Sequence, residues 1–255
     1  FWGLCAAAAT GFSVQVAHLI GAGNFAGARK ILRQSITATL LFGSSLAAIG
    51  VFISDFLPGW LGGDEIIRKD SSVYFLIFSL FLPVLQMNFL ASGMLRCSGN
   101  MYIPSILNIL MCLLDIIFNF FLIFPKRQIE IMGLNIDIYG AGLGVKGAAL
   151  GTVLAELVTA GGMMWYLCYR SPILKLSGER GYFLLRQDTL RNAVRISFPM
   201  GFEHIAICGA QIMTTIIVAP LGIIAIAANS FAIIAESLCY MPGYGISEAA
   251  TTLVG

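Results

Sequence analysis

Long apolar runs alternate with short polar links along the whole chain, and the length of the runs predicts helices that cross a membrane. A bilayer core about 30 Å thick needs roughly 20 residues of helix, each rising about 1.5 Å. Seven windows meet this requirement, at residues 1–20, 34–57, 71–95, 103–124, 143–169, 194–220 and 223–246. The pattern therefore predicts an all-α membrane protein, a polytopic helical bundle with about seven spans in this chain.

The polar links differ in charge between the two sides of the predicted bundle. Short cytoplasmic loops carry an excess of Lys and Arg. When the links are assigned to alternate sides, one side holds ten basic residues and the other holds five. The ten are Arg29, Lys30, Arg33, Arg96, Arg170, Lys175, Arg180, Arg186, Arg191 and Arg195, and the five are Arg68, Lys69, Lys126, Arg127 and Lys146. We therefore expect the longest link, Arg170 to Leu190, to be cytoplasmic.

The composition supports a membrane protein and argues against several kinds of function. Of the 255 residues, 58% are hydrophobic and 11% are charged, and the mean hydropathy is +0.87. An ordinary soluble domain is about a quarter charged. The basic residues form no continuous face, so we expect no nucleic acid partner. The motifs H-E-x-x-H, G-x-S-x-G and Walker A are missing from the sequence, so we expect no enzyme and no cofactor.

A glycine-rich segment that begins at Gly142 matches the dinucleotide-binding fingerprint G-x-G-x-x-G. That fingerprint requires a preceding strand, and the sequence predicts none there. Gly147 and Gly151 are four residues apart in the apolar run that follows, a spacing that lets two membrane helices pack closely. We therefore predict helix packing and no nucleotide binding.

An internal repeat divides the chain into two unequal parts. Residues 11–21 (GFSVQVAHLIG) and 245–255 (GISEAATTLVG) share Gly, Ser, Leu and Gly at a constant offset of 234 positions. The two copies are an even number of predicted crossings apart, so they run in the same direction, as parallel repeats require. The repeat predicts two parallel-repeat lobes, with residues 1–169 as the N-terminal lobe, 170–193 as the link and 194–255 as the start of the second lobe. On this interpretation the chain is incomplete.

Four acidic residues lie near the middle of predicted spans: Asp115, Glu156, Glu203 and Glu236. An ionisable side chain at that depth is costly unless it faces protein or water. Three of the four acidic residues have an amide side chain at helical spacing in the same span. Asn119 is four residues after Asp115, Gln211 is eight after Glu203, and Asn229 is seven before Glu236. We predict that these seven residues bind an ion or a substrate, and that Asp115, Asn119 and Glu156 share a cavity. The alternative is that they only join helices through hydrogen bonds.

Three prolines inside predicted spans, Pro83, Pro199 and Pro242, are candidate kinks or hinges. A proline inside a helix removes one backbone hydrogen bond and frees a carbonyl group. Membrane helices tolerate this where a neighbour or a cavity satisfies the carbonyl. Pro199 lies one turn before Glu203, so we expect a bend beside that carboxyl group.

Five stretches resemble the multidrug and toxic compound extrusion (MATE) family, in the order and spacing of that family. They are TGFSVQVAHLIGAGNFAGARK, LRCSGNMYIP, GLGVKGAALGTV, SFPMG and MPGYGISEAATTLVG. Family members have twelve helices in two lobes, so the resemblance implies that this chain holds helices two to eight of a bacterial-type member. Two positions depart from the family pattern. His18 stands where the family often has Gln, and Asp115 followed by Asn119 reverses the usual order.

The resemblance implies a secondary antiporter of the plasma (inner) membrane that exports amphipathic or cationic organic compounds in exchange for H⁺ or Na⁺. MATE proteins commonly place an acidic residue in helix seven, which implies a coupling role for Glu203, with Na⁺ bound at Glu203 or Asp115. The full-length protein would be monomeric, with the lipid bilayer and small organic cations or amphipathic drugs as partners. Two alternatives stay open: a lipid-linked saccharide flippase of the related superfamily, and a non-transporting membrane scaffold.

Overall fold

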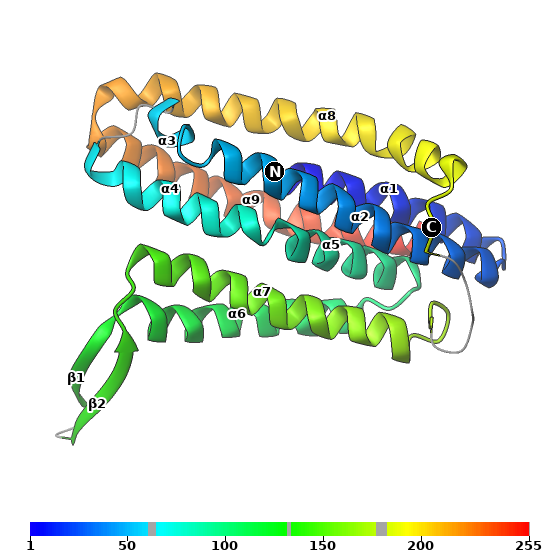
Figure 1. The fold of residues 1–255 in the computed structure, drawn as a ribbon, viewed down its shortest axis with the longest axis horizontal. Coiled ribbons are helices and arrows are strands. Elements are labelled where there is room, and N and C mark those ends of the chain that lie inside the picture. Colours follow the sequence, from blue (N-terminus) through cyan, green and yellow to red (C-terminus); the bar gives the residue numbers. More distant parts are fainter. Residues whose placement is uncertain (61–64, 132–133, 177–182, 255) are drawn as a thin grey trace.

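A computed structural model describes residues 1–60, 65–131, 134–176 and 183–254 as an elongated bundle of helices with a small sheet at one end (Figure 1). The elements are α1 (Trp2–Gly21), α2 (Phe25–Ile53), α3 (Leu57–Trp60), α4 (Glu65–Leu80), α5 (Leu82–Cys97), α6 (Tyr102–Ile123), β1 (Pro125–Ile131), β2 (Leu134–Ala141), α7 (Val145–Trp165), a π-helical turn (Tyr166–Arg170), α8 (Gln187–Val218), a 3-10 turn (Ala219–Leu221) and α9 (Ile223–Val254). The long helices lie along one common direction, and α1 and α9 run the same way, as the repeat predicts.

In the part of the chain that the structure describes, helices agree in length and apolar character with six of the seven predicted membrane spans. In the described residues, five helices are long and apolar enough to cross a bilayer: α1, α2, α6, α7 with its π-helical turn, and α8. Helices α4 and α5 together pass the same test as one bent span. The remaining predicted window, 223–246, lies within α9, which is helical over its whole length. The chain is a multi-pass helical membrane protein.

The predicted window 71–95 contains two helices, α4 and α5, with a break between them. Helices α4 and α5 meet at a bend of 48°, and Pro83 lies in the first turn of α5. A proline has no N–H to donate to the preceding turn, and its ring clashes with that turn's carbonyl group, so the break falls beside it. Helices α8 and α9 continue through Pro199 and Pro242. A hinge at either of these two prolines stays a prediction.

Helices α2, α4 and α8 each begin at least six residues before their apolar windows, with α4 starting at Glu65 instead of residue 71. Helix α2 starts at Phe25 instead of residue 34, because Asn24 caps it: the Asn24 Oδ1 accepts a hydrogen bond from the Gly27 N–H at 2.9 Å. Helix α8 starts at Gln187 instead of residue 194. A hydropathy window finds the part of a helix that lies in the bilayer core, whereas the cap determines where the helix itself begins.

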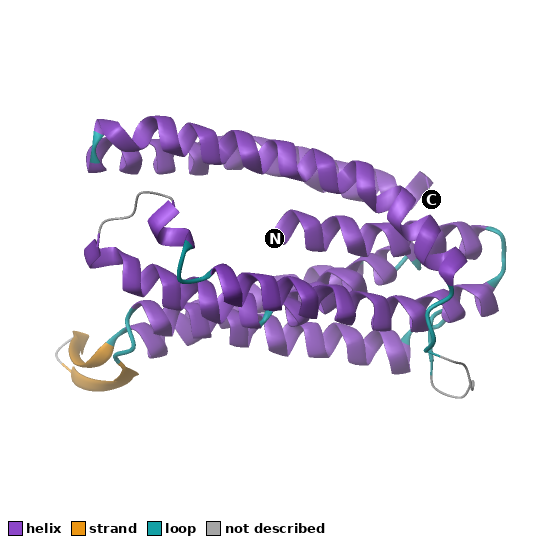
Figure 2. Cartoon of the chain, turned by 45° about the horizontal axis from the view of Figure 1, so that its top comes forward, coloured by secondary structure: helices purple, strands orange, loops and turns teal. Residues whose placement is uncertain are grey.

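The link from Pro125 to Gly142 contains a β-hairpin that the sequence interpretation missed. Strands β1 and β2 pair in antiparallel fashion, with Ile129 opposite Ile136, and Figure 2 shows the hairpin at the end of the bundle opposite the α1–α2 turn. A strand therefore does precede the glycine-rich segment at Gly142, contrary to our expectation. Its partner is an antiparallel neighbour and not the parallel strand of a βαβ unit, so a dinucleotide site is still not formed.

The core of the bundle lies where α1, α2, α5 and α7 meet. One cluster of buried apolar side chains includes Val16 from α1, Leu32 from α2, Leu90 from α5 and Met163 from α7. Leu174, from the link that follows α7, completes the same cluster and is fully buried. The part of the link around Leu174 is therefore packed into the bundle.

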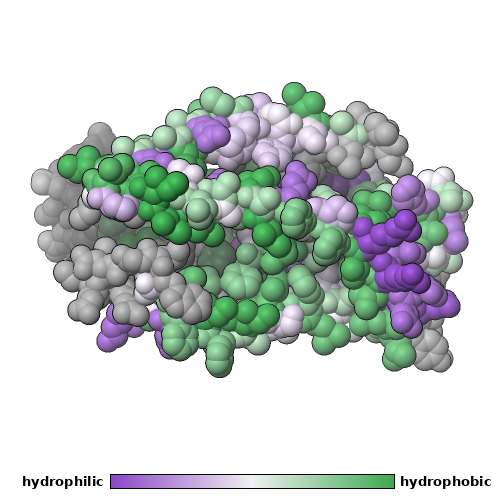
Figure 3. All heavy atoms as spheres, turned by 90° about the horizontal axis from the view of Figure 1, so that it is seen from above, coloured by the Kyte–Doolittle hydropathy of each residue, from purple (hydrophilic) through white to green (hydrophobic). Residues whose placement is uncertain are grey.

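Hydrogen bonds fix this link to the ends of α1 and α2. The Arg29 Nε donates to the Ile173 carbonyl oxygen at 3.0 Å, and the Gln15 Nε2 donates to the Thr189 carbonyl oxygen at 3.3 Å. Residues 177–182 of the link, including Arg180, lie outside the described residues. Figure 3 shows hydrophilic residues gathered at this end of the molecule, where the predicted cytoplasmic charges Lys30, Arg170 and Lys175 are exposed or partly exposed.

The predicted glycine contact is present between α6 and α7. An ideal Cβ at Gly147 would lie 2.5 Å from the Leu122 carbonyl oxygen. One at Gly151 would clash with the Asn119 side chain. Both glycines therefore allow α7 to approach α6 more closely than any larger residue would, which confirms the predicted packing role.

Two glutamines are buried in the bundle but differ in their hydrogen bonds. Gln34 on α2 is 2% exposed, and its Oε1 accepts a hydrogen bond from the Arg186 N–H at 3.4 Å. Gln86 on α5 is 0% exposed, and within the described part of the chain neither its Nε2 nor its Oε1 has a partner. It lies against Gly43 of α2. An unpaired buried amide lowers stability, so Gln86 is a costly residue at this position.

Replacing Gly147 by Ala should destabilise the bundle. The new methyl group would overlap the Leu122 backbone, and overpacking of this kind costs about 1–3 kcal/mol. Gly161→Ala on the same helix is the matched control, since nothing lies within 4 Å of a Cβ there. We expect thermal unfolding of the purified full-length protein to occur at lower temperature for Gly147→Ala only. Equal shifts in the two variants would contradict the packing explanation.

Replacing Gln86 by Met should stabilise the protein, because it removes two unpaired polar atoms and keeps an unbranched side chain. We expect the free energy of unfolding to rise by about 1–3 kcal/mol. Gln34→Met, at an equally buried position, should lower it, because the Arg186 N–H loses its acceptor. Thermal unfolding of the full-length protein measures both changes. If Gln86→Met is as destabilising as Gln34→Met, the Gln86 amide is bound to a group such as a water molecule.

A cysteine placed in the link should be accessible only from the cytoplasm. Lys175 is exposed at the link end of the bundle, and Lys126 is exposed on β1 at the other end. We expect an impermeant thiol reagent on intact cells to label Lys126→Cys and not Lys175→Cys, with labelling of Lys175→Cys only after permeabilisation. The unmodified protein measures the background from native cysteines. Labelling of Lys175→Cys on intact cells would reverse the predicted orientation.

Candidate functional site

An amide and a carboxyl group join α5 to α7 in the interior of the bundle. The Asn88 Nδ2 on α5 donates a hydrogen bond to the Glu156 Oε1 on α7 at 3.4 Å. Asn88 is 9% exposed, and Glu156 is partly buried. In the described part of the chain, no basic side chain forms an ion pair with Glu156. Glu156 is thus a mid-span carboxyl group with an uncharged hydrogen-bond partner.

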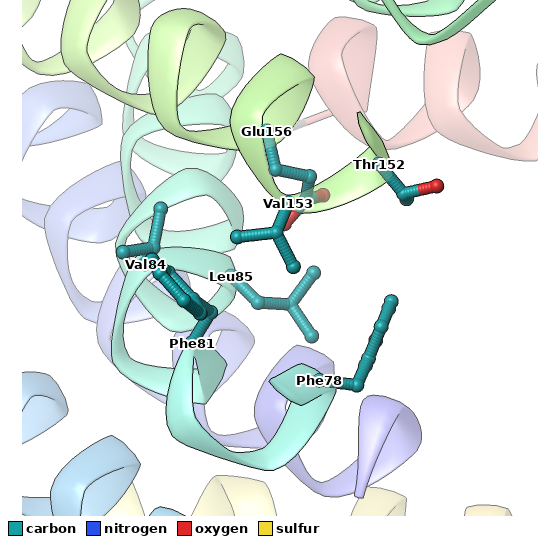
Figure 4. A pocket seen from close by; sticks show the side chains of 7 residues that line it. All are labelled: Phe78, Phe81, Val84, Leu85, Thr152, Val153 and Glu156. Carbon is teal, nitrogen blue, oxygen red and sulfur yellow. The ribbon is translucent and has the colours of Figure 1, made fainter. Parts of the chain in front are cut away.

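A small pocket lies beside this pair. Its volume of about 10 Å³ is roughly the space that one water molecule needs. The lining residues are Phe78, Phe81, Val84, Leu85, Thr152, Val153 and Glu156. Figure 4 shows the Glu156 side chain directed toward Leu85 and Val153, while the Thr152 hydroxyl points away from it. That hydroxyl donates to the Ala148 carbonyl oxygen at 3.2 Å. The surroundings of Glu156 are therefore mostly apolar.

A second amide–carboxyl pair lies on α6. The Asn119 Nδ2 donates to the Asp115 Oδ1 at 3.0 Å, one helical turn away, which agrees with the predicted common face. The Asn119 Oδ1 is buried and has no partner among the described residues. This pair belongs to α6 alone, whereas Glu156 binds Asn88 of α5. That Asp115, Asn119 and Glu156 share one cavity therefore stays a prediction.

The candidates on α8 and α9 are more open. The side chains of Glu203, Gln211 and Glu236 are exposed, and Asn229 is partly buried. The structure shows no side-chain hydrogen bond that connects these four residues to one another. Their role as an ion or substrate site stays a prediction.

Two glycines of α1 allow α8, the helix that carries Glu203, to pack closely against α1. An ideal Cβ at Gly3 would lie 2.7 Å from the His204 Cβ, and one at Gly11 would clash with Ser197 and approach the Ala193 carbonyl oxygen to 2.6 Å. The side chain that follows Glu203 thus packs against the predicted N-terminal lobe. This close contact leaves Glu203 itself exposed.

Sequence reasoning missed Asn88, the partner of Glu156. It searched mid-span segments for ionisable groups, and the window 71–95 has none near its middle, only the uncharged polar residues Gln86, Asn88 and Ser92. An amide inside a span is itself a signal, because it needs a hydrogen-bond partner within the protein. Which helix supplies that partner depends on packing and could not be determined from the sequence.

Comparisons with known proteins agree on one family. The MatE family model matches residues 1–121. The probable multidrug resistance protein NorM of Thermotoga maritima is 30% identical over 253 residues, which cover 98% of this chain and 51% of that protein. The chain thus spans about half the length of this relative.

Two solved structures of a multidrug resistance MATE family transporter share the fold. The outward-facing conformation has a TM-score of 0.81 at 21% identity and covers 98% of this chain and 52% of that chain. The inward-facing conformation has a TM-score of 0.70 at 21% identity and covers 86% of this chain and 47% of that chain. These relatives are transporters and not enzymes. Residues 1–121 thus match the MatE family model, and the chain shares the fold of solved transporters of the multidrug and toxic compound extrusion family.

Proposed function

We propose that this chain forms part of a secondary antiporter of the plasma (inner) membrane, which exports amphipathic or cationic organic compounds in exchange for H⁺ or Na⁺. The observation that carries the proposal is a carboxyl group at mid-span, Glu156, hydrogen-bonded between two spans of a MATE-family bundle. An ionisable residue at that depth is a functional candidate by default, because the bilayer makes it costly to retain. The drug-resistance relative supports the substrate class.

The chemistry of exchange follows from competition for negative charge. A carboxylate inside the bundle attracts a cationic substrate, a proton or a sodium ion, and occupation by one reduces the attraction for the others. Entry of the coupling ion down its gradient can then displace the substrate from the same site. Glu203 and Glu236, exposed on α8 and α9, are the candidates in the second lobe.

Sodium coupling has its best support at Asp115. Na⁺, like other hard cations, prefers oxygen ligands, and Asp115 offers its carboxylate beside the buried Asn119 Oδ1, which has no partner in the described residues. Proton coupling needs only a carboxyl group, such as that of Glu156. Sodium and protons therefore favour different residues of this chain.

Replacing Glu203 by Gln should abolish gradient-driven efflux, because the amide keeps the size and hydrogen bonding of the side chain but cannot carry the charge. We expect at least a tenfold loss of initial efflux rate, with near-normal expression. The assay is efflux of a fluorescent organic cation from vesicles that contain the full-length protein, with proton and sodium gradients imposed separately. Glu236→Gln, on the next helix, is the matched comparison.

Two results would contradict this proposal in different ways. If Glu203→Gln keeps its efflux and Glu236→Gln loses it, the coupling carboxylate is Glu236. If the unaltered protein transports at a rate that ignores both gradients, the antiport mechanism itself is wrong.

A further inference from the structure

The pair formed by Asn88 and Glu156 leaves one buried acceptor without a donor. The Asn88 Nδ2 donates to the Glu156 Oε1 at 3.4 Å, whereas the Asn88 Oδ1 is buried and has no partner in the described part of the chain. A buried acceptor without a donor lowers the stability of the fold. The nearest side chain already engaged with this amide is a carboxyl group, which can supply the missing donor if it carries a proton.

We propose that Asn88 and Glu156 form a proton-binding site within the membrane, in which the protonated Glu156 carboxyl group donates to the Asn88 Oδ1. A carboxylic acid and a primary amide can pair through two parallel hydrogen bonds, because the donor and acceptor atoms of each have similar spacing. Proton binding forms an O–H bond on one Glu156 oxygen, and proton release breaks that bond. This inference rests on the proposed antiport and assigns its proton to a specific pair.

The surroundings favour a proton over a metal cation at this position. The pocket beside Glu156 is lined mainly by Phe78, Phe81, Val84, Leu85 and Val153, whereas a sodium ion needs several oxygen ligands. The Thr152 hydroxyl points away (Figure 4). In the residues that the structure describes, no group of three or more His, Cys, Asp or Glu side chains is placed to hold a metal ion.

Among the described residues, no basic side chain pairs with Glu156 to neutralise its charge. Among the side chains that the structure describes, the titratable and charged groups on the elements around Glu156 are Cys5 and His18 on α1, Lys69, Asp70 and Tyr74 on α4, Arg96 and Cys97 on α5, Tyr102, Cys112 and Asp115 on α6, and Lys146 on α7. The basic groups lie at the ends of their helices. A neutral Glu156 therefore fits this apolar environment better than a carboxylate does.

Whether Glu156 carries a proton affects the contact between α5 and α7. With the proton present, two hydrogen bonds join α5 to α7. Without it, a buried carboxylate keeps one hydrogen bond, and the Asn88 Oδ1 stays unpaired. Release of the proton should therefore loosen this contact, at a place next to the 48° bend between α4 and α5.

Infrared difference spectroscopy of the full-length protein in liposomes tests the site without requiring transport. A protonated carboxyl group gives a C=O stretching band that shifts in D₂O. We expect Glu156→Gln to remove one such band and Glu236→Gln, the control, to keep it. Asn88→Leu, which has a similar shape, should move the Glu156 band to higher frequency, because the carbonyl oxygen loses the hydrogen bond from the amide.

The outcomes separate this site from the antiport proposal. A band unchanged in Glu156→Gln would show that Glu156 is ionised and would overturn the inference. So would an unshifted band in Asn88→Leu, a measurement that also decides the question if Glu156→Gln does not fold. Loss of the band on adding sodium at constant pH would show that Glu156 binds a sodium ion in place of the proton, and would overturn the inference. If the Glu156 band is present but the protein shows no gradient-driven efflux, the proton-binding site is supported and the antiport proposal is contradicted.

Discussion

Inside a bilayer there is no water to complete a hydrogen bond, and every polar group must find its partner within the protein. Helices meet this requirement for the backbone, and apolar side chains such as Phe52 and Ile116, 80% and 67% exposed, cover the outer surface. The polar side chains that remain carry the functional information. Four of them form two amide–carboxyl pairs, Asn88 with Glu156 and Asn119 with Asp115. In each pair the amide oxygen still lacks a donor within the described residues, which is why we propose a proton at the first pair and a sodium ion at the second.

The same environment explains why small residues determine which helices touch. Lipid tails are as apolar as Leu, so burial alone gives membrane helices little reason to associate, and close backbone approach has to supply the attraction. Gly147 and Gly151 bring α7 onto α6, and Gly3 and Gly11 bring α1 onto α8. The first contact places Glu156 within the bundle at the level of Asn88. The second attaches α8, which carries Glu203, to the predicted N-terminal lobe.

The spans could be predicted from the sequence because hydropathy over a bilayer-length window is a local property. Each of the seven windows coincides with helix over most of its length, and the window 71–95 is interrupted between α4 and α5. Pro83 predicted a break in its span, but the sequence could not predict the angle of the bend. The early start of α2 depends on the Asn24 cap, which a hydropathy window does not include. The hairpin was missed because its alternation of polar residues with Ile129, Ile131, Ile136 and Ile138 is short. The carboxyl groups could be found because ionisable residues are rare inside spans, but Asn88 could not be assigned to Glu156 until packing placed α5 beside α7.

The contacts of this chain also differ in how readily they can change during transport. The α6–α7 seam depends on backbone atoms at van der Waals distance, which cannot slide without forming voids. At the opposite extreme, the link contributes hydrogen bonds such as those from Gln15 to Thr189 and from Arg186 to Gln34, each worth about 0.5–1.5 kcal/mol net. These bonds lie at the end of the bundle where hydrophilic residues gather (Figure 3). In the proposed exchange cycle, opening at that end breaks weak, replaceable bonds while the packed seams move as rigid bodies. In the site proposed at Asn88 and Glu156, release of the proton removes one hydrogen bond between α5 and α7, a change of the same order as the loss of one of these link bonds.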